Sequence, residues 1–129
     1  MYQITFTPHR NLITAKLSGL FTVREVASYI AELQKQFLQH HFKSGYVMLI
    51  DTTDCAIQQQ DVLAAMQQHM ANFPKARRLA VVTGSSLAKM QVRRVMHQSY
   101  LRIVPTTAEA HEWLFGEGDE APAETRAAG

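Results

Sequence analysis

The stretch Asp51-Thr52-Thr53-Asp54-Cys55 gathers two carboxylates, two hydroxyl groups and one thiol. Groups of these kinds carry out acid–base catalysis, metal binding and nucleophilic attack. The same residue types also turn a chain by bonding to their own backbone, which is the structural alternative. No histidine accompanies them, and the six histidines form no H-E-x-x-H pattern. We therefore expect no catalytic residue, no metal and no cofactor, in a chain that is not an enzyme.

Cys55 is the single cysteine of the chain, which excludes an internal disulfide and a multi-thiolate metal site. A nucleophilic thiol needs a lowered pKa and a histidine base, and no such signature surrounds Cys55. The first residues also lack the basic and apolar segments of a signal peptide, and no apolar run is long enough to span a membrane. We expect an unreactive thiol and a cytoplasmic protein.

A second candidate site is Gly84-Ser85-Ser86, which follows a buried strand pattern and precedes a helical one. Free backbone N–H groups and hydroxyls at a helix start form a generic anion site, and Lys89 and Arg93 add positive charge on that helix. Neither a P-loop nor a dinucleotide-binding glycine pattern occurs, so plain helix capping is the alternative. No aromatic residues interleave with the basic ones, so nucleic acid is not an expected partner.

The composition is typical of one folded domain, followed by a C-terminal segment of different composition. The chain has 129 residues, of which 47% are hydrophobic and 19% charged, enough for one core without a disulfide or metal. The segment 116–129 carries Glu117, Asp119, Glu120 and Glu124 against Arg126, and is rich in Gly, Ala and Pro without apolar periodicity. We expect a single α/β domain over residues 1–115 and an acidic, disordered tail over 116–129.

Alternating or continuous apolar runs predict strands over residues 2–7, 12–17, 46–50, 78–83 and 100–104. The first two form a hairpin, because the turn residues Pro8-His9-Arg10-Asn11 separate them. The ten-residue stretch Asp51 to Gln60 is a predicted loop at a strand's carboxyl end, where open α/β sheets place their ligands. The candidate partner-binding residues of this loop and the next helix start are Asp51, Thr52, Thr53, Asp54, Gln58, Gln60 and Asp61.

Capping residues mark the helix starts: Thr22 with Glu25, Ser85 or Ser86, and Thr106 with Glu109. The first helix has an apolar stripe of Val23, Val26, Ala27, Ile30, Leu33, Phe37 and Leu38. The second has Val62, Leu63, Met66, Met70 and Phe73; the third has Leu87, Ala88, Val92, Val95 and Met96; the last has Ala110, Trp113 and Leu114. We expect each stripe to be buried against the sheet. Alternation of strands and helices predicts an α/β fold, since parallel strands need helical crossovers.

In order and spacing these elements resemble the STAS domain, the SpoIIAA-like fold of anti-sigma-factor antagonists and sulfate-transporter tails, and especially its stand-alone bacterial members. The resemblance covers residues 1–115 and is carried by Leu17-Ser18-Gly19, Val47–Asp51, Arg78–Val82 and Thr107–Leu114. It implies a mixed, mainly parallel sheet of about five strands with four helices and an N-terminal β-hairpin.

The resemblance also implies a non-enzymatic regulatory or protein-interaction module, whose partner is another protein or a second copy of the chain. In the antagonists, a partner kinase phosphorylates a serine in an Asp-Ser-Ser-Gly-like motif after the central strand. The corresponding stretch here, Gln58–Leu63, has no hydroxyl, so we do not expect this phospho-switch; Asp61 would supply a negative helix N-cap. The alternative function is a small-ligand binder, with a lipid, nucleotide or other anion in a pocket at the strand carboxyl ends and at Ser85-Ser86.

Overall fold

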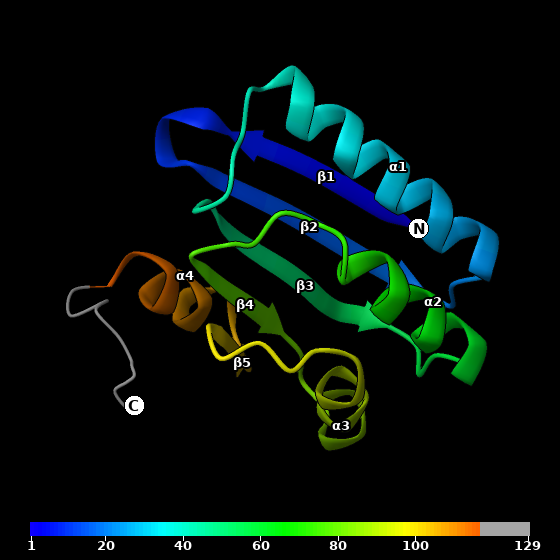
Figure 1. Ribbon diagram of the computed structural model, residues 1–129. Coiled ribbons are helices and arrows are strands. Elements are labelled where there is room, and N and C mark those ends of the chain that lie inside the picture. Colours follow the sequence, from blue (N-terminus) through cyan, green and yellow to red (C-terminus); the bar gives the residue numbers. More distant parts are fainter. Residues whose placement is uncertain (117–129) are drawn as a thin grey trace.

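The sheet of this computed structural model, which describes residues 1–116, holds its strands in the order in which they occur along the chain (Figure 1). The strands are β1 (Tyr2–Thr7), β2 (Leu12–Gly19), β3 (Val47–Cys55), β4 (Arg78–Val82) and β5 (Leu101–Val104). β1 and β2 form an antiparallel hairpin around a short 3-10 turn, and every later neighbour is parallel. The predicted mixed, mainly parallel sheet with an N-terminal hairpin is confirmed.

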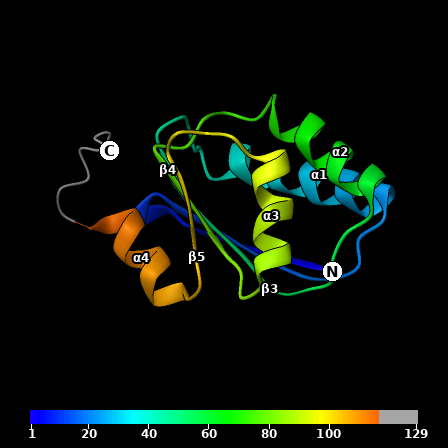
Figure 2. The same cartoon turned by 90° about the horizontal axis from the view of Figure 1, so that it is seen from below.

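The helices lie on both faces of this sheet (Figures 1 and 2). They are α1 (Val23–Gln39), α2 (Gln60–Met70), α3 (Ser86–Val95) and α4 (Thr107–Phe115). The strand order never reverses, so right-handed crossovers place α1, α2 and α3 on the same face. The last helix follows the edge strand β5 and turns back over the opposite face.

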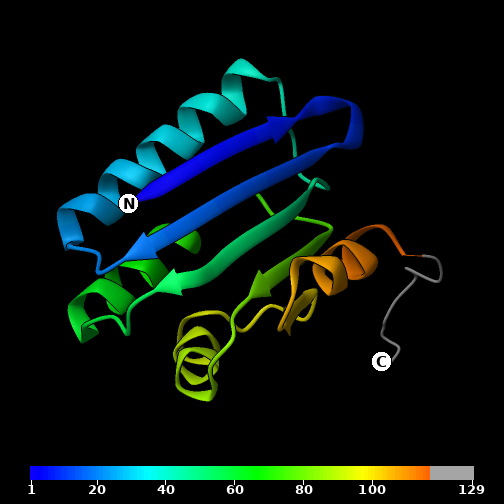
Figure 3. The same ribbon diagram turned by 180° about the vertical axis from the view of Figure 1, so that it is seen from behind.

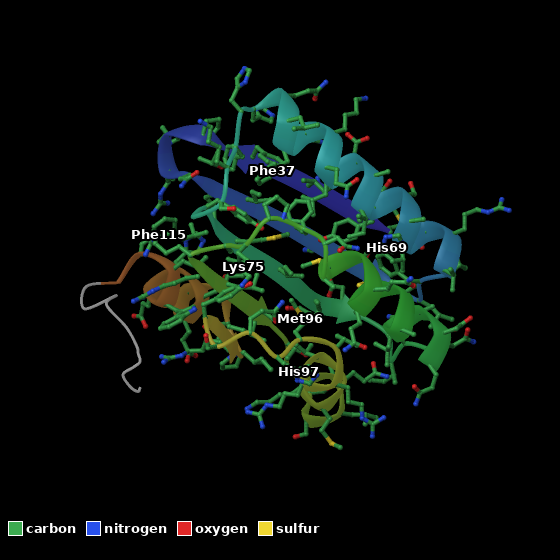
Figure 4. All side chains as sticks on the ribbon, viewed as in Figure 1. Phe37, His69, Lys75, Met96, His97 and Phe115 are labelled. Atoms are coloured by element: carbon green, nitrogen blue, oxygen red, sulfur yellow. The ribbon has the colours of Figure 1, made fainter. Side chains whose placement is uncertain are left out.

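The core has one cluster on each face of the sheet. Under α1 and α2, the Phe37 ring makes edge-on contacts with Phe42, Tyr46 and Phe73, at centroid distances of 5.9, 5.3 and 5.2 Å. Figure 4 shows Phe37 between α1 and the sheet. This aromatic cluster, Phe37, Phe42, Tyr46 and Phe73, joins α1, the start of β3 and the end of α2.

The predicted apolar stripe of α1 is partly wrong. Val23, Ala27 and Leu38 are exposed, whereas Tyr29, which the stripe omitted, is 2% exposed. Because α1 lies over the edge of the sheet, only the side that faces the strands is covered. An aromatic ring with one polar atom fills that side as well as an aliphatic chain does.

On the opposite face, α4 packs on β3, β4 and β5, and Figure 3 shows β1 and β2 without a helix over them there. Ala110 and Leu114 are buried as predicted. Trp113 is only half-buried, because its ring packs against the guanidinium groups of Arg78 and Arg102, each 4.2 Å from the ring centroid. Its indole N–H donates to the Leu79 carbonyl, which ties α4 to β4.

Three of the predicted helix caps are confirmed by hydrogen bonds. The hydroxyls of Thr22, Ser85 and Thr106 accept from the backbone N–H groups of Glu25, Ala88 and Glu109. α2 differs, since it begins after Gln59, which makes no side-chain cap. Asp61 is therefore not the N-cap as predicted; it lies in the first turn and accepts from the Val62 N–H at 2.8 Å.

Gly45, just before β3, has a φ of +98°, which side chains rarely tolerate. A methyl group there would meet nothing within 4 Å, so Gly45→Ala changes only the backbone energy. We expect it to lower the free energy of unfolding by about 1–2 kcal/mol. Gly84→Ala is the matched control, because Gly84 has equal space and no positive φ. Urea denaturation of both variants checks this, and equal stabilities would contradict it.

Candidate functional site

The first half of the predicted loop from Asp51 to Gln60 is a strand. β3 continues to Cys55, so only residues 56–59 connect it to α2. The polar side chains of Asp51–Cys55 do not end the strand, because the backbone of this segment pairs with Lys16–Gly19 of β2. The loop prediction is wrong for a physical reason: strand pairing is a property of the backbone, and this half of β3 has a partner.

A β-bulge lies in this polar half of β3. Lys16 pairs with Asp51 and Ser18 with Asp54, so β3 holds one more residue than β2 over this interval. Side chains alternate between the faces of a strand, and an extra residue shifts the alternation by one. Thr52 and Cys55 therefore lie on the same face of the sheet, under the helices, where both line a cavity.

The two aspartates that were candidates for catalysis or metal binding, Asp51 and Asp54, each interact with a neighbouring residue. Asp51 accepts hydrogen bonds from the backbone N–H and the hydroxyl of Thr53, at 2.9 and 2.6 Å. Asp54 forms an exposed ion pair with Lys16 at 3.6 Å. Neither lines the cavity. Asp51 thus bonds to its neighbouring backbone, as the structural alternative has it, whereas Asp54 pairs with a lysine side chain.

Gln58 is the predicted site residue with the most contacts. Its side-chain oxygen accepts from the Phe21 N–H at 2.8 Å, and its amide donates to the carbonyls of Gly19 and Ala56. The Gln91 side chain on α3 bonds in turn to the backbone N–H and carbonyl of Gln58, at 3.0 and 2.9 Å. Gln58 thus connects the ends of β2 and β3 to α3. Gln60, by contrast, is exposed at the first turn of α2.

The predicted anion site is separate from these residues. Ser85 uses its hydroxyl to cap α3, and Gly84, Ser86, Lys89 and Arg93 are exposed. The cavity wall includes none of them. Capping, the structural alternative, accounts for Ser85. The sequence placed this segment and Asp51–Asp61 at the same sheet edge, but the structure does not join them into one pocket.

Between α1, α2, α3 and the sheet lies a cavity with almost entirely apolar walls, which we call the helix-layer cavity. The space within it that is open to the centres of water molecules measures about 100 Å³. It lies over the carboxyl halves of β2, β3 and β4. Representative lining residues are Leu17, Ile50, Leu63, Met66, Val81 and Val92. Pockets with apolar walls of this kind take up small apolar molecules.

The cavity exists because α3 stands away from the core. Within the described residues α3 is the α-helix without a buried side chain, which contradicts the prediction that its stripe is buried. Leu87 is 54% exposed, while Ala88, Val92, Val95 and Met96 are half-buried around the cavity. Figure 4 shows Met96 between α3 and the sheet. An amphipathic pattern is the same whether a helix packs on a core or walls a cavity.

The wall of the helix-layer cavity carries no charge. Its polar members are Tyr29, Thr52, Cys55, Gln58 and Gln91. Burial raises the pKa of the Cys55 thiol to about 11, and burial also raises the pKa of the Tyr29 hydroxyl. Burial thus favours the uncharged form of both groups at physiological pH. Among the described residues, this wall offers no charged partner to an anion of the kind that the sequence suggested.

Comparison with solved structures finds proteins of similar fold. A protein of the DUF3478 family from Shewanella loihica PV-4, described as uncharacterized and as having a SpoIIAA-like fold, superposes with a TM-score of 0.66 at 15% identity. The match covers 88% of this chain and 93% of that one. This chain has a SpoIIAA-like fold. No family model and no curated protein matches the sequence.

The SpoIIAA-like fold confirms the architecture that the resemblance implied, including the N-terminal hairpin, the five-stranded sheet and the four helices. No helix in the described part of the chain is both long and apolar enough to cross a membrane. The expected tail over 116–129 lies outside the described residues, apart from Gly116. In this SpoIIAA-like domain the start of α2, Gln60-Asp61-Val62, offers no hydroxyl for phosphorylation.

Proposed function

We propose that this SpoIIAA-like domain is a non-enzymatic module that binds a small apolar ligand in the helix-layer cavity. The observation that carries the proposal is a cavity of about 100 Å³ with apolar walls between the sheet and three helices. Filling such a cavity is favourable, because contact with the ligand replaces both empty space and exposed apolar surface. The half-buried Met66 and Met70 add flexible, polarizable surface that adapts to a ligand's shape.

The helix layer also explains how a ligand would enter. α3 contributes no buried side chain, and its attachment near the cavity includes the paired hydrogen bonds between Gln91 and the backbone of Gln58. A helix with few buried apolar contacts opens at lower cost than the rest of the fold. Movement of α3 would therefore admit the ligand without disturbing the sheet.

Toluene, a small apolar probe, tests this proposal together with a variant that fills the cavity. Ala88 lines the cavity from α3, so Ala88→Trp would place an indole in it. Ala64→Trp is the matched control, because Ala64 is exposed on α2. In NMR titrations, toluene should shift amides of the cavity wall saturably in the wild type and in Ala64→Trp. Ala88→Trp should bind at least tenfold more weakly, because the indole occupies the space that toluene needs.

Two results would contradict ligand binding: no saturable shift in the wild-type protein, or equal affinities of Ala88→Trp and Ala64→Trp. Mass spectrometry of an organic extract of the purified protein would complement the titration. An apolar molecule retained at a stoichiometric level, and absent from Ala88→Trp, would identify the natural ligand.

A protein-interaction role is the second candidate, and exposed apolar side chains favour it. Leu20 and Ile57 are 54% and 43% exposed, on the neighbouring connections that follow β2 and β3. The hydrogen bond from the Ala56 N–H to the Gly19 carbonyl, at 3.1 Å, holds these connections together. The partner we propose is a second copy of the chain. Native mass spectrometry should show a dimer that Ile57→Ser weakens, whereas a monomer at all concentrations would exclude this role.

A further inference from the structure

The helix-layer cavity contains a buried hydroxyl group that has no partner among the described residues. Tyr29 lines the cavity, is 2% exposed, and its hydroxyl has no hydrogen-bond partner among the described residues. A buried hydroxyl without a partner costs about 1–3 kcal/mol, so native proteins rarely keep one without a reason.

The other oxygen- and nitrogen-bearing side chains of the wall, those of Thr52, Gln58 and Gln91, have hydrogen bonds within the protein. The Thr52 hydroxyl donates to the Val82 carbonyl at 2.8 Å, and Gln58 and Gln91 bond to backbone groups as described above. Outside the wall, the Tyr2 hydroxyl beside the Tyr29 ring pairs with Ser28 Oγ at 2.7 Å. The Tyr29 hydroxyl thus differs from these neighbouring polar groups in lacking a hydrogen-bond partner.

We infer that the Tyr29 hydroxyl is the polar anchor of the ligand site, that is, the group that donates a hydrogen bond to the ligand. This inference rests on the proposed function. The ligand is then an uncharged molecule with a small apolar body and one hydroxyl or carbonyl oxygen, which accepts a hydrogen bond from Tyr29. A carboxylate or phosphate does not fit, because the wall offers no cation to replace the water that such a group would lose.

Toluene and p-cresol provide the test, since they share one apolar body and differ by a hydroxyl group. Wild-type protein should bind p-cresol more tightly than Tyr29→Phe does, by roughly tenfold, the equivalent of one buried hydrogen bond. Toluene should bind both proteins equally. Cys55→Ala is the control for the other polar atom of the wall without a stated partner, and it should keep the full p-cresol affinity.

The results separate the two claims. If neither probe binds the wild type, the ligand-binding proposal fails and the anchor fails with it. If both probes bind but Tyr29→Phe leaves the p-cresol affinity unchanged, the cavity remains a ligand site and the anchor is overturned. If the Tyr29 hydroxyl had only a structural role, Tyr29→Phe would lower the thermal stability and would weaken the binding of toluene and p-cresol alike. The anchor instead predicts a selective loss of p-cresol binding with no loss of thermal stability.

Discussion

Phe37→Ala should lower the free energy of unfolding by about 3–5 kcal/mol, the range measured when large buried aromatic residues are truncated. Phe37 is 6% exposed and contacts three other aromatic rings, from the segment after α1, the start of β3 and the end of α2. Its removal leaves a void that these rings, which are fixed by their own elements, cannot fill. The loss is a large part of the 5–15 kcal/mol that is typical of a whole domain.

Leu38→Ala is the matched control for Phe37→Ala, because the two residues are adjacent on α1 and Leu38 is 73% exposed. It should change stability by less than about 0.5 kcal/mol. Chemical denaturation measures both, and Phe37→Leu gives a smaller, still measurable loss if the alanine variant does not fold. Similar losses for Phe37→Ala and Leu38→Ala would show that the aromatic cluster does not hold the helix layer to the sheet.

The domain should also unfold cooperatively in alkali. Burial raises the pKa of Tyr29 and of Tyr46 above the ordinary value of 10.0, and raises that of Cys55 from 9.0 to about 11. These groups lose their protons more readily in the unfolded chain than in the folded one. Their contribution to stability is therefore complete below about pH 8 and is lost as the pH rises through 9 to 11 and beyond.

Circular dichroism and tyrosinate absorbance, recorded together against pH, check this expectation. The two signals should change over the same pH range, because the buried phenols ionise when the chain unfolds. Tyr29→Phe removes the most deeply buried of these groups and should move the alkaline midpoint upward by about half a pH unit or more. An unchanged midpoint in Tyr29→Phe, or tyrosinate formation in a protein that stays folded, would contradict this account.

The architecture could be predicted from the sequence because it depends on interactions between residues that are close in the chain. Thr22, Ser85 and Thr106 cap helices as predicted, and the continuous apolar runs became the buried strands. Hydrogen bonds of this kind depend on residues three positions apart, which a sequence displays directly.

The site was less predictable, because its features depend on distances between elements. The bulge that places Cys55 in the cavity arises from the pairing of β3 with β2, which no local pattern encodes. The cavity arises because α3 stands off from the sheet, whereas apolar periodicity in Leu87–Met96 reports only which side of the helix is apolar. Tyr29 carried a weak signal, since it adjoins Ile30 and lies between Val26 and Leu33 on a buried stripe. Its lack of a partner is visible only in three dimensions.

The position of α3 has a consequence for how this domain can evolve. In many proteins a change of specificity sacrifices stability, because binding residues also belong to the core. Here α3 supplies four cavity-lining residues, Ala88, Gln91, Val92 and Val95, and the helix itself holds no buried side chain. Stability resides in the sheet and in the aromatic cluster beneath α1. If the proposed ligand site is real, mutations in α3 would exchange one ligand for another at little cost to folding, so a lineage would diversify its ligands while the scaffold stays unchanged.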